Sequence, residues 1–241
     1  MNLSQTTIEA PIAAPGEPHL ACVLLVDTSN SMSGYAIESL NQAINDFKEQ
    51  TSMDAMAMKR VDVAIIEFND DARVVQEFTP IAQMRPVRLT AGGLTAMGAG
   101  INLAIDKLKE RNRLYASLGT PCFKPWIFMI TDGEPYGEDE NTFREATKRL
   151  REEEGKGKHG KLKFFALGVE GYNKDVLFKM LAHQKEPRVM ELRDLNFGTI
   201  FDWMAQSMVA ISVSRVGDEA RLPSLPSNAR KADPKRDVSD W

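Results

Sequence analysis

The sequence predicts an α/β sandwich: a mainly parallel central sheet with one antiparallel edge strand and helices on both faces. Three observations support this prediction. Short runs of consecutive apolar residues recur along the chain, amphipathic segments separate them, and two of the runs stop abruptly at an aspartate. Uninterrupted apolar runs are typical of strands covered on both faces, as in parallel sheets. Alternation of strands and helices then gives a three-layer α/β/α arrangement.

This alternation occupies residues 19–216, which we interpret as one domain. The 241 residues, 43% of them hydrophobic, are enough to fill one sizeable core. Residues 1–18 contain three prolines spaced so that neither helix nor strand can run through them, and we expect an extended leader. Residues 217–241 lose apolar periodicity and are rich in Pro, Ser, Lys and Asp, and we expect a disordered tail.

The first half of the domain begins with a buried strand at residues 20–26, LACVLLV. A helix should follow, because positions 37, 40, 44 and 47 are apolar while Asn41 and Asn45 fall on the opposite face. Residues 61–68 and 73–78 flank a short NDDA turn and should pair as an antiparallel hairpin, one strand of which lies at an edge.

The alternation then continues to the end of the domain. Thr142 and Glu145 have capping-box spacing and predict the start of a helix that runs through Leu150. The remaining predicted elements are helices at 97–108, 174–182 and 197–208 and strands at 126–130, 161–169 and 189–192.

Composition excludes several classes of function. The net charge is -4 and no basic face is apparent, so we expect no nucleic-acid partner. No apolar stretch approaches the roughly 20 residues of a membrane helix, and the amino terminus lacks the pattern of a signal peptide. We therefore expect a cytoplasmic protein without a membrane partner. Two cysteines are too few for a cysteine zinc site.

The chemistry of the chain is concentrated where two apolar strands end, at Asp27 and Asp132. The carboxyl ends of parallel strands lie at one edge of a sheet, so these two carboxylates should approach each other. Carboxylates held together in a buried place raise one another's pKa, which a cation between them would relieve. The sequence therefore predicts a site for a hard divalent cation.

Hydroxyl groups complete the predicted site. Asp27, Ser29 and Ser31 alternate in the loop DTSNS, so their side-chain oxygens can point to one centre. The glycine-rich loop LTAGGLTAMGAG, residues 89–100, allows close backbone approach and presents the hydroxyl of Thr95. Few acidic ligands and several neutral oxygens suit Mg²⁺, which retains positions for water or an incoming carboxylate.

These three motifs, in this order, resemble the von Willebrand factor A domain with its metal-ion-dependent adhesion site. The resemblance implies a Rossmann-like fold and binding of Mg²⁺, with Mn²⁺ or Ca²⁺ as alternatives. It also implies a protein partner that supplies an acidic residue to the metal. Two departures concern Asn30, where the family usually has glycine, and Leu94, which separates Gly93 from the threonine, so Thr90 is an alternative ligand. The implied ligands are Asp27, Ser29, Ser31, Thr95 and Asp132.

The segments FFALGVEGYNKDVL and ELRDLNFGTIFDWM resemble a stand-alone bacterial subgroup related to the tellurium-resistance protein TerY. That resemblance implies an adaptor in stress or tellurium-resistance signalling through phosphorylation. The implied partners are a serine/threonine protein kinase and a PP2C-type, metal-dependent phosphatase.

The alternative functions are a Mg²⁺-dependent phosphatase and a metal-free scaffold. A Mg²⁺-dependent phosphatase that forms an aspartyl-phosphate needs a second carboxylate two positions after the nucleophile, and Ser29 occupies that position. The chain also has no P-loop and no G-x-S-x-G nucleophile motif, so we expect no catalytic residues and no enzyme. A metal-free scaffold remains the other alternative, although every expected ligand type is present.

Overall fold

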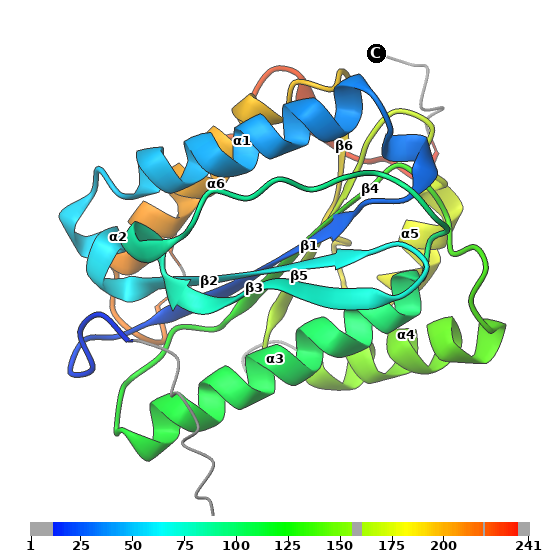
Figure 1. The fold of residues 1–241 in the computed structure, drawn as a ribbon. Coiled ribbons are helices and arrows are strands. Elements are labelled where there is room, and N and C mark those ends of the chain that lie inside the picture. The colour runs from blue at the N-terminus through cyan, green and yellow to red at the C-terminus, as the bar shows by residue number, and fades with distance from the viewer. Residues whose placement is uncertain (1–11, 156–160, 219, 236–241) are drawn as a thin grey trace, which may run out of the picture.

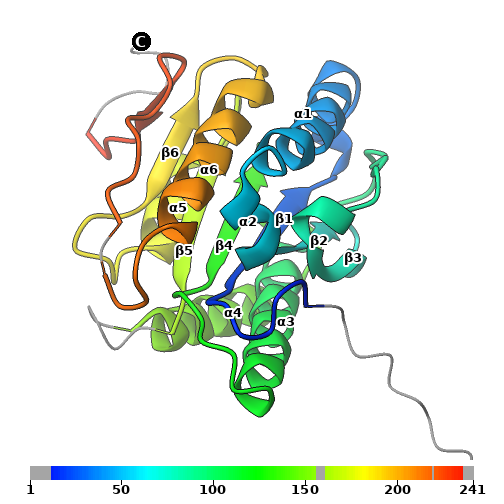
Figure 2. The same cartoon turned by 90° about the vertical axis from the view of Figure 1, so that its left-hand side faces the viewer.

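The computed structural model describes residues 12–155, 161–218 and 220–235. Within them, a seven-stranded sheet in the order β3-β2-β1-β4-β5-β6-β7 forms the middle of three layers (Figures 1 and 2). The predicted three-layer α/β fold with a mainly parallel sheet is thus confirmed. The parallel strands are β1 (Leu20–Asp27), β2 (Val61–Phe68), β4 (Trp126–Thr131), β5 (Lys163–Gly168) and β6 (Val189–Leu192).

The central strand β1 shows why apolar runs predict this sheet. All eight of its residues are buried, and alternate side chains enter different cores. Leu24 packs on one side of the sheet, whereas Leu25 packs on the other. A strand covered on both faces needs apolar residues at every position, so its sequence does not alternate.

Two groups of helices cover the sheet. Figure 1 shows α1 and α6 on one face and α3 and α4 on the other. The helices are α1 (Tyr35–Thr51), α2 (Ala55–Arg60), α3 (Met97–Ser117), α4 (Glu140–Glu154), α5 (Lys174–Met180) and α6 (Phe197–Ser212), with short 3-10 turns η1 (Asn30–Met32) and η2 (Ile81–Gln83). In the described part of the chain, no helix is long and apolar enough to cross a membrane.

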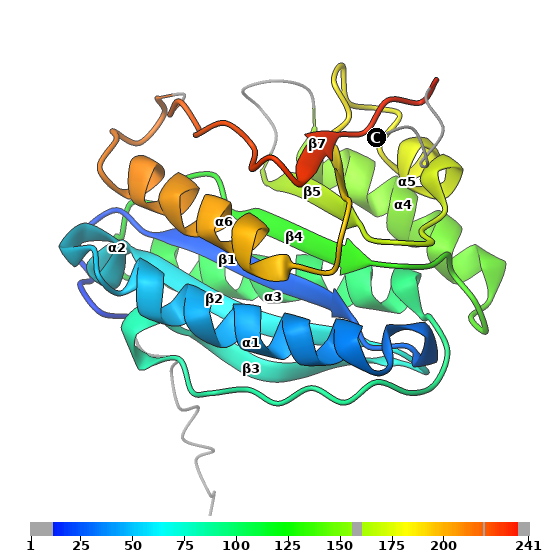
Figure 3. The same ribbon diagram turned by 90° about the horizontal axis from the view of Figure 1, so that it is seen from above.

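The sheet has antiparallel strands at both edges. The strand β3 (Ala72–Pro80) pairs with β2, as the hairpin pattern predicted. The strand β7 (Ala229–Lys231) pairs with β6, with Leu192 opposite Ala229 (Figure 3). It lies in residues 217–241, where we expected a disordered tail, and it adds a second antiparallel edge to the predicted one at β3. Three residues reading Ala-Arg-Lys carry no periodicity that could reveal a strand.

Further contacts hold the segment before β7 to the domain. Trp203 of α6 donates a hydrogen bond from Nε1 to the carbonyl of Pro223, at 2.9 Å. Leu222 and Leu225 pack against the core on the α1 and α6 side of the sheet. Of the predicted leader, residues 12–18 are described, and the Thr120 hydroxyl donates to the carbonyl of Pro15 at 2.6 Å. The rest of the leader lies outside the described residues.

Helix α4 begins earlier than the capping box predicted. Its N-cap is Asp139, whose side chain accepts a hydrogen bond from the amide of Asn141. Thr142 is already within the helix. The segment Glu-Asp-Glu-Asn-Thr offers several capping residues in succession, and the first aspartate that can accept from the helix amides takes the role.

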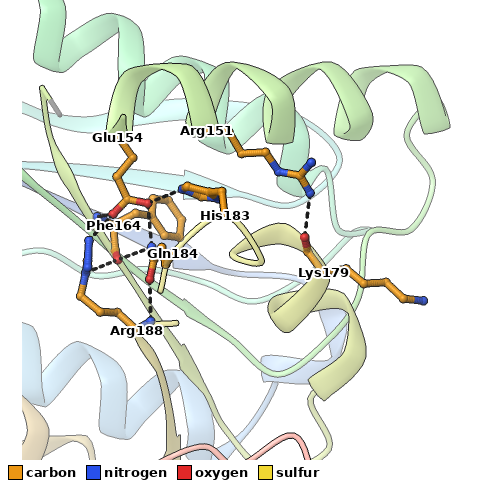
Figure 4. A network of polar contacts seen from close by, with 7 residues as sticks. All are labelled: Arg151, Glu154, Phe164, Lys179, His183, Gln184 and Arg188. Atoms are coloured by element: carbon orange, nitrogen blue, oxygen red, sulfur yellow. Dashed lines mark hydrogen bonds and ion pairs between the residues drawn. The ribbon is translucent and has the colours of Figure 1, made fainter. Parts of the chain in front are cut away.

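Buried polar networks at the amino ends of the strands are structural. The buried carboxylate of Glu154, at the end of α4, accepts hydrogen bonds from the Phe164 amide and from His183, Gln184 and Arg188, at 2.5 to 2.9 Å (Figure 4). These contacts join α4, the amino end of β5 and the loop after α5. The predicted site lies at the opposite, carboxyl ends of the strands.

His19 and His183, the two histidines in the described part of the chain, belong to no group that could hold a metal. His19 is buried, with Nδ1 2.8 Å from Asp62 and Nε2 3.0 Å from the carbonyl of Ala14. His159 lies outside the described residues. Both cysteines are free thiols.

Candidate metal site

The carboxyl edge of the sheet brings the ends of β1 and β4 together. Val26 lies beside Ile130 in the parallel register, so the next residues, Asp27 and Thr131, are neighbours. The Thr131 hydroxyl donates to Asp27 Oδ2 at 2.6 Å, and the Ser29 amide donates to Asp27 Oδ1 at 2.9 Å. Asp27 is fully buried. Its carboxylate is therefore fixed in orientation before any ligand arrives.

A chain of hydrogen bonds links the two predicted aspartate loops. The hydroxyls of Ser29 and Ser31 lie 3.0 Å apart, and Ser31 donates to Asp132 Oδ1 at 2.8 Å. Ser29 is buried, Ser31 is exposed and Asp132 is half-buried. The oxygens thus run from the interior to the surface, and the site is open to solvent on the side of Ser31.

The glycine-rich loop lies against the DTSNS loop. The Gly92 amide donates to the carbonyl of Thr28 at 2.9 Å, and the Asn30 amide donates to the carbonyl of Gly93 at 3.1 Å. Gly93 has a φ of 79°, and a Cβ there would lie 2.7 Å from the carboxyl group of Asp70. Both the backbone conformation and the close approach require glycine at this position.

The backbone of Thr95 pairs with the loop that follows β4 at the carboxyl edge of the sheet. Its amide and carbonyl exchange two hydrogen bonds with Tyr136, at 3.0 and 3.1 Å, in the loop that follows Asp132. Thr95 is only 7% exposed, whereas the alternative ligand Thr90 is exposed. Thr95 is therefore a buried threonine beside the loop that follows Asp132, and Thr90 is not buried.

Two asparagines position the glycine-rich loop, although the sequence pattern marks them only as part of the polar face of a helix. Asn41 of α1 accepts from the Leu89 amide at 2.7 Å and donates to the Leu89 carbonyl at 2.9 Å. Asn45, one turn later, makes the same pair of contacts with Val87, at 3.1 and 3.2 Å. This segment runs beside α1 in Figure 1. The helix that follows the DTSNS loop thereby also fixes the approach to Thr95.

The electrostatics of the site favour a cation. The pKa of Asp27 is raised to about 6, mainly by burial and to a smaller extent by the nearby Asp132 carboxylate, while hydrogen bonds from Ser29 and Thr131 act to lower it. Burial also raises the pKa of Asp132, against the hydrogen bond from Ser31. No positive group is among these influences. Two carboxylates thus approach each other without a compensating charge.

The donor set suits a hard divalent cation. Within the described ranges no three or more His, Cys, Asp or Glu side chains form a group that could hold a metal, so a cation at Asp27 and Asp132 would also need neutral oxygen ligands. Ser29 and Ser31 supply hydroxyls beside the two carboxylates. Thr95, buried in the glycine-rich loop, is the third hydroxyl of the predicted set. Oxygen ligands of low total charge fit Mg²⁺ or Mn²⁺, and the absence of sulfur and imidazole disfavours softer ions.

The fold and this constellation define a von Willebrand factor type A domain. That family matches residues 22–203, which is most of the chain, and the chain belongs to it. No curated protein matches the sequence.

Solved structures agree on the fold. A von Willebrand factor type A protein from Catenulispora acidiphila is 16% identical with a TM-score of 0.57, over 80% of this chain and 43% of that chain. The pilus adhesin SpaC from Lactobacillus rhamnosus GG is 13% identical with a TM-score of 0.61, over 84% and 31%.

Proximal thread matrix protein 1 from the mussel byssus has been solved with a zinc-occupied metal-ion-dependent adhesion site. It is 17% identical to this chain with a TM-score of 0.53, over 80% of this chain and 47% of that chain. The chain spans less than half the length of each of these three proteins. At such identities the similarity establishes the fold.

Proposed function

We propose that this domain is a metal-dependent protein-interaction module of the adhesion-site type. Its ligands for a divalent cation, Mg²⁺ first, are Asp27, Ser29, Ser31, Thr95 and Asp132. The observation that carries the proposal is the continuous chain of contacts from Ser29 through Ser31 to Asp132, at 3.0 and 2.8 Å, above the buried Asp27. Side chains from two strand ends converge there without a positive charge among them.

Each residue has a distinct part in binding. Ser29 and Ser31 offer neutral oxygens, so the ion keeps most of its charge for an incoming ligand. Asp27 is fixed by Thr131 and by the Ser29 amide, and it supplies charge either directly or through water. When bound, the cation would accept an acidic side chain of the partner. The exposed side of Ser31 and the half-buried Asp132 leave this approach open.

The same site argues against hydrolysis. An aspartyl-phosphate mechanism needs an accessible nucleophilic carboxylate and an acid nearby. Asp27 is fully buried, and the position that would hold the acid is Ser29. We therefore propose a binding role without catalytic residues. A metal-free scaffold is the second candidate, favoured only by the hydrogen bonds that the site oxygens already make with one another.

The biological setting is a further part of the proposal. The segments around β5 and α6 that resemble the TerY subgroup support an adaptor in bacterial stress or tellurium-resistance signalling. Such an adaptor would act in the cytoplasm with a protein kinase and a PP2C-type phosphatase. A carboxylate on either partner would complete the metal shell.

Calorimetric titration of Mn²⁺ and Mg²⁺ into metal-stripped protein tests the metal site. Wild type should bind one equivalent, and Ser29→Ala and Asp132→Asn should each weaken binding by about tenfold or more, since each loses one ligand. Glu152→Gln is the matched control, because Glu152 is exposed near the far end of α4. It should bind as wild type does.

The fold of each variant is checked by circular dichroism and thermal unfolding. Binding that survives both site variants would place the metal elsewhere. A wild type that binds neither ion would favour the metal-free scaffold.

A further inference from the structure

The loops around the candidate metal site are strongly and uniformly acidic. Residues 27–35, 69–71, 91–99 and 132–140 contain eight aspartates and glutamates and no lysine, arginine or histidine. Two of the eight are the proposed ligands Asp27 and Asp132, which leaves six. Five of those six are exposed: Asp70, Asp71, Glu134, Asp139 and Glu140. A divalent cation would offset only the charge of its own two carboxylates.

The turn that carries Asp70 and Asp71 lies next to the site. Asp70 Oδ1 accepts a hydrogen bond from the Leu94 amide at 2.9 Å, directly before Thr95. Asn69, in the same turn, donates to the Thr28 hydroxyl at 3.2 Å. The acidic turn between β2 and β3 is therefore joined to both the DTSNS loop and the glycine-rich loop. A partner that reaches the metal must come within the field of these carboxylates.

An exposed aromatic ring stands beside Thr95. Tyr136 and Thr95 form a mutually hydrogen-bonded antiparallel pair, and side chains of such a pair lie on the same face. Tyr136 is nevertheless 68% exposed while Thr95 is 7% exposed. Tyr35, at the start of the helix α1 that follows the DTSNS loop, is 66% exposed. Rings that bury so little of their own surface are available to a partner.

We propose that the partner presents its metal-binding carboxylate within a cluster of arginine or lysine side chains, and that Tyr136 receives one of these cations on its ring. This inference rests on the proposed function and adds the chemistry of the partner. A segment acidic throughout would meet six uncompensated like charges, whereas basic flanks would be attracted to them. Cations pack favourably on exposed tyrosine faces, which accounts for an aromatic ring within an acidic rim.

Three fluorescent heptapeptides provide the probes. Each has a central residue between two alanines, with two charged residues at each end. The first carries a central aspartate and arginine ends, the second the same aspartate and glutamate ends, and the third a central asparagine and arginine ends. Binding is measured by anisotropy with saturating Mn²⁺ and with EDTA, after Mn²⁺ binding itself has been measured on the same samples.

The first peptide should bind about tenfold or more tightly than the second, and only with Mn²⁺. The third should lose the Mn²⁺-dependent binding. Raising NaCl from roughly 20 to roughly 200 mM should weaken the first complex severalfold, because the rim charges are solvent-exposed.

Variants separate the rim from the metal. Asp70→Asn with Asp71→Asn should weaken the first peptide about three- to tenfold and leave Mn²⁺ affinity nearly unchanged. The control, Glu49→Gln with Glu152→Gln, removes the same charge from exposed positions near the far ends of α1 and α4 and should have little effect. Tyr136→Ala should weaken binding about threefold, and Tyr136→Phe should restore it.

Equal binding of the first two peptides, or Mn²⁺ binding without any peptide binding, would overturn this inference and leave the metal site standing. Absence of Mn²⁺ binding to wild type would instead overturn the proposed function, and this inference with it.

Discussion

Replacement of Asp27 by asparagine should stabilise the metal-free protein while it abolishes metal binding. The pKa of Asp27 rises from 3.8 to about 6 on folding, chiefly because the carboxyl group is buried. The folded state therefore holds a proton more tightly than the unfolded state. Stability must then fall as pH rises from about 4 to about 6, and the loss persists above that range. A difference of roughly two pKa units corresponds to about 3 kcal/mol.

Asparagine has no charge to bury, and it can still accept a hydrogen bond from the Ser29 amide. The Thr131 hydroxyl donates to Asp27 Oδ2 in the wild type, and it would have to accept from the asparagine amide nitrogen in the variant. This change reduces the expected gain in the free energy of unfolding to about 2 kcal/mol. Urea denaturation of metal-stripped wild type and Asp27→Asn, followed by circular dichroism at pH 7.5 and pH 4.5, measures it. The variant should be more stable at pH 7.5, and the difference should shrink at pH 4.5.

Mg²⁺ should reverse the order of stability at pH 7.5. It binds only wild type, and ligand at 100 times its dissociation constant stabilises a protein by about 2.7 kcal/mol. A metal-free Asp27→Asn variant less stable than wild type at pH 7.5, or a difference independent of pH, would show that burial of the Asp27 charge does not destabilise the metal-free protein.

Three further predictions test other parts of the structure. Asn41→Leu with Asn45→Leu removes the hydrogen bonds to Val87 and Leu89. The double variant should bind Mn²⁺ about three- to tenfold more weakly and show faster hydrogen exchange at residues 92–95. Unchanged exchange would show that these asparagines do not position the loop. Glu154→Ala leaves buried donors without an acceptor and should lower the free energy of unfolding by about 3 kcal/mol. Its Mn²⁺ affinity, measured by calorimetry, should equal that of wild type. A change in affinity would mean that the two ends of the domain are coupled. Mn²⁺ affinity of wild type should fall as pH drops below about 6, because protonated Asp27 cannot serve as a charged ligand; a titration that is flat between pH 7.5 and 5 would remove Asp27 from the site.

The sequence revealed the fold because its information is local to each element. An apolar run such as LACVLLV specifies a doubly covered strand by itself, and the aspartate that ends it marks the carboxyl edge. The contacts among Asp27, Ser29 and Ser31 follow from spacing within one loop. Asp132 could be placed beside them because parallel strands share an edge.

Other features depended on distant partners and left no local pattern. Asn41 and Asn45 looked like ordinary polar residues of a helix, and only the backbone of Val87 and Leu89 explains them. The strand β7 pairs with β6 through three residues without periodicity. The sequence does not identify the N-cap of α4, because several residues that can cap a helix follow one another there. The path of the preceding loop determines that Asp139 is the N-cap.

Crystals of the protein grown with Mn²⁺, and an anomalous difference map at the manganese edge, would locate the metal. We expect one strong peak at the carboxyl edge of the sheet, within about 2.2 Å of the hydroxyl oxygens of Ser29 and Ser31. The Ser31 hydroxyl should then no longer donate to Asp132 as it does at 2.8 Å in the metal-free protein. A peak located only elsewhere, or no peak in crystals where the five residues are well ordered, would contradict the assignment of this edge as a metal site.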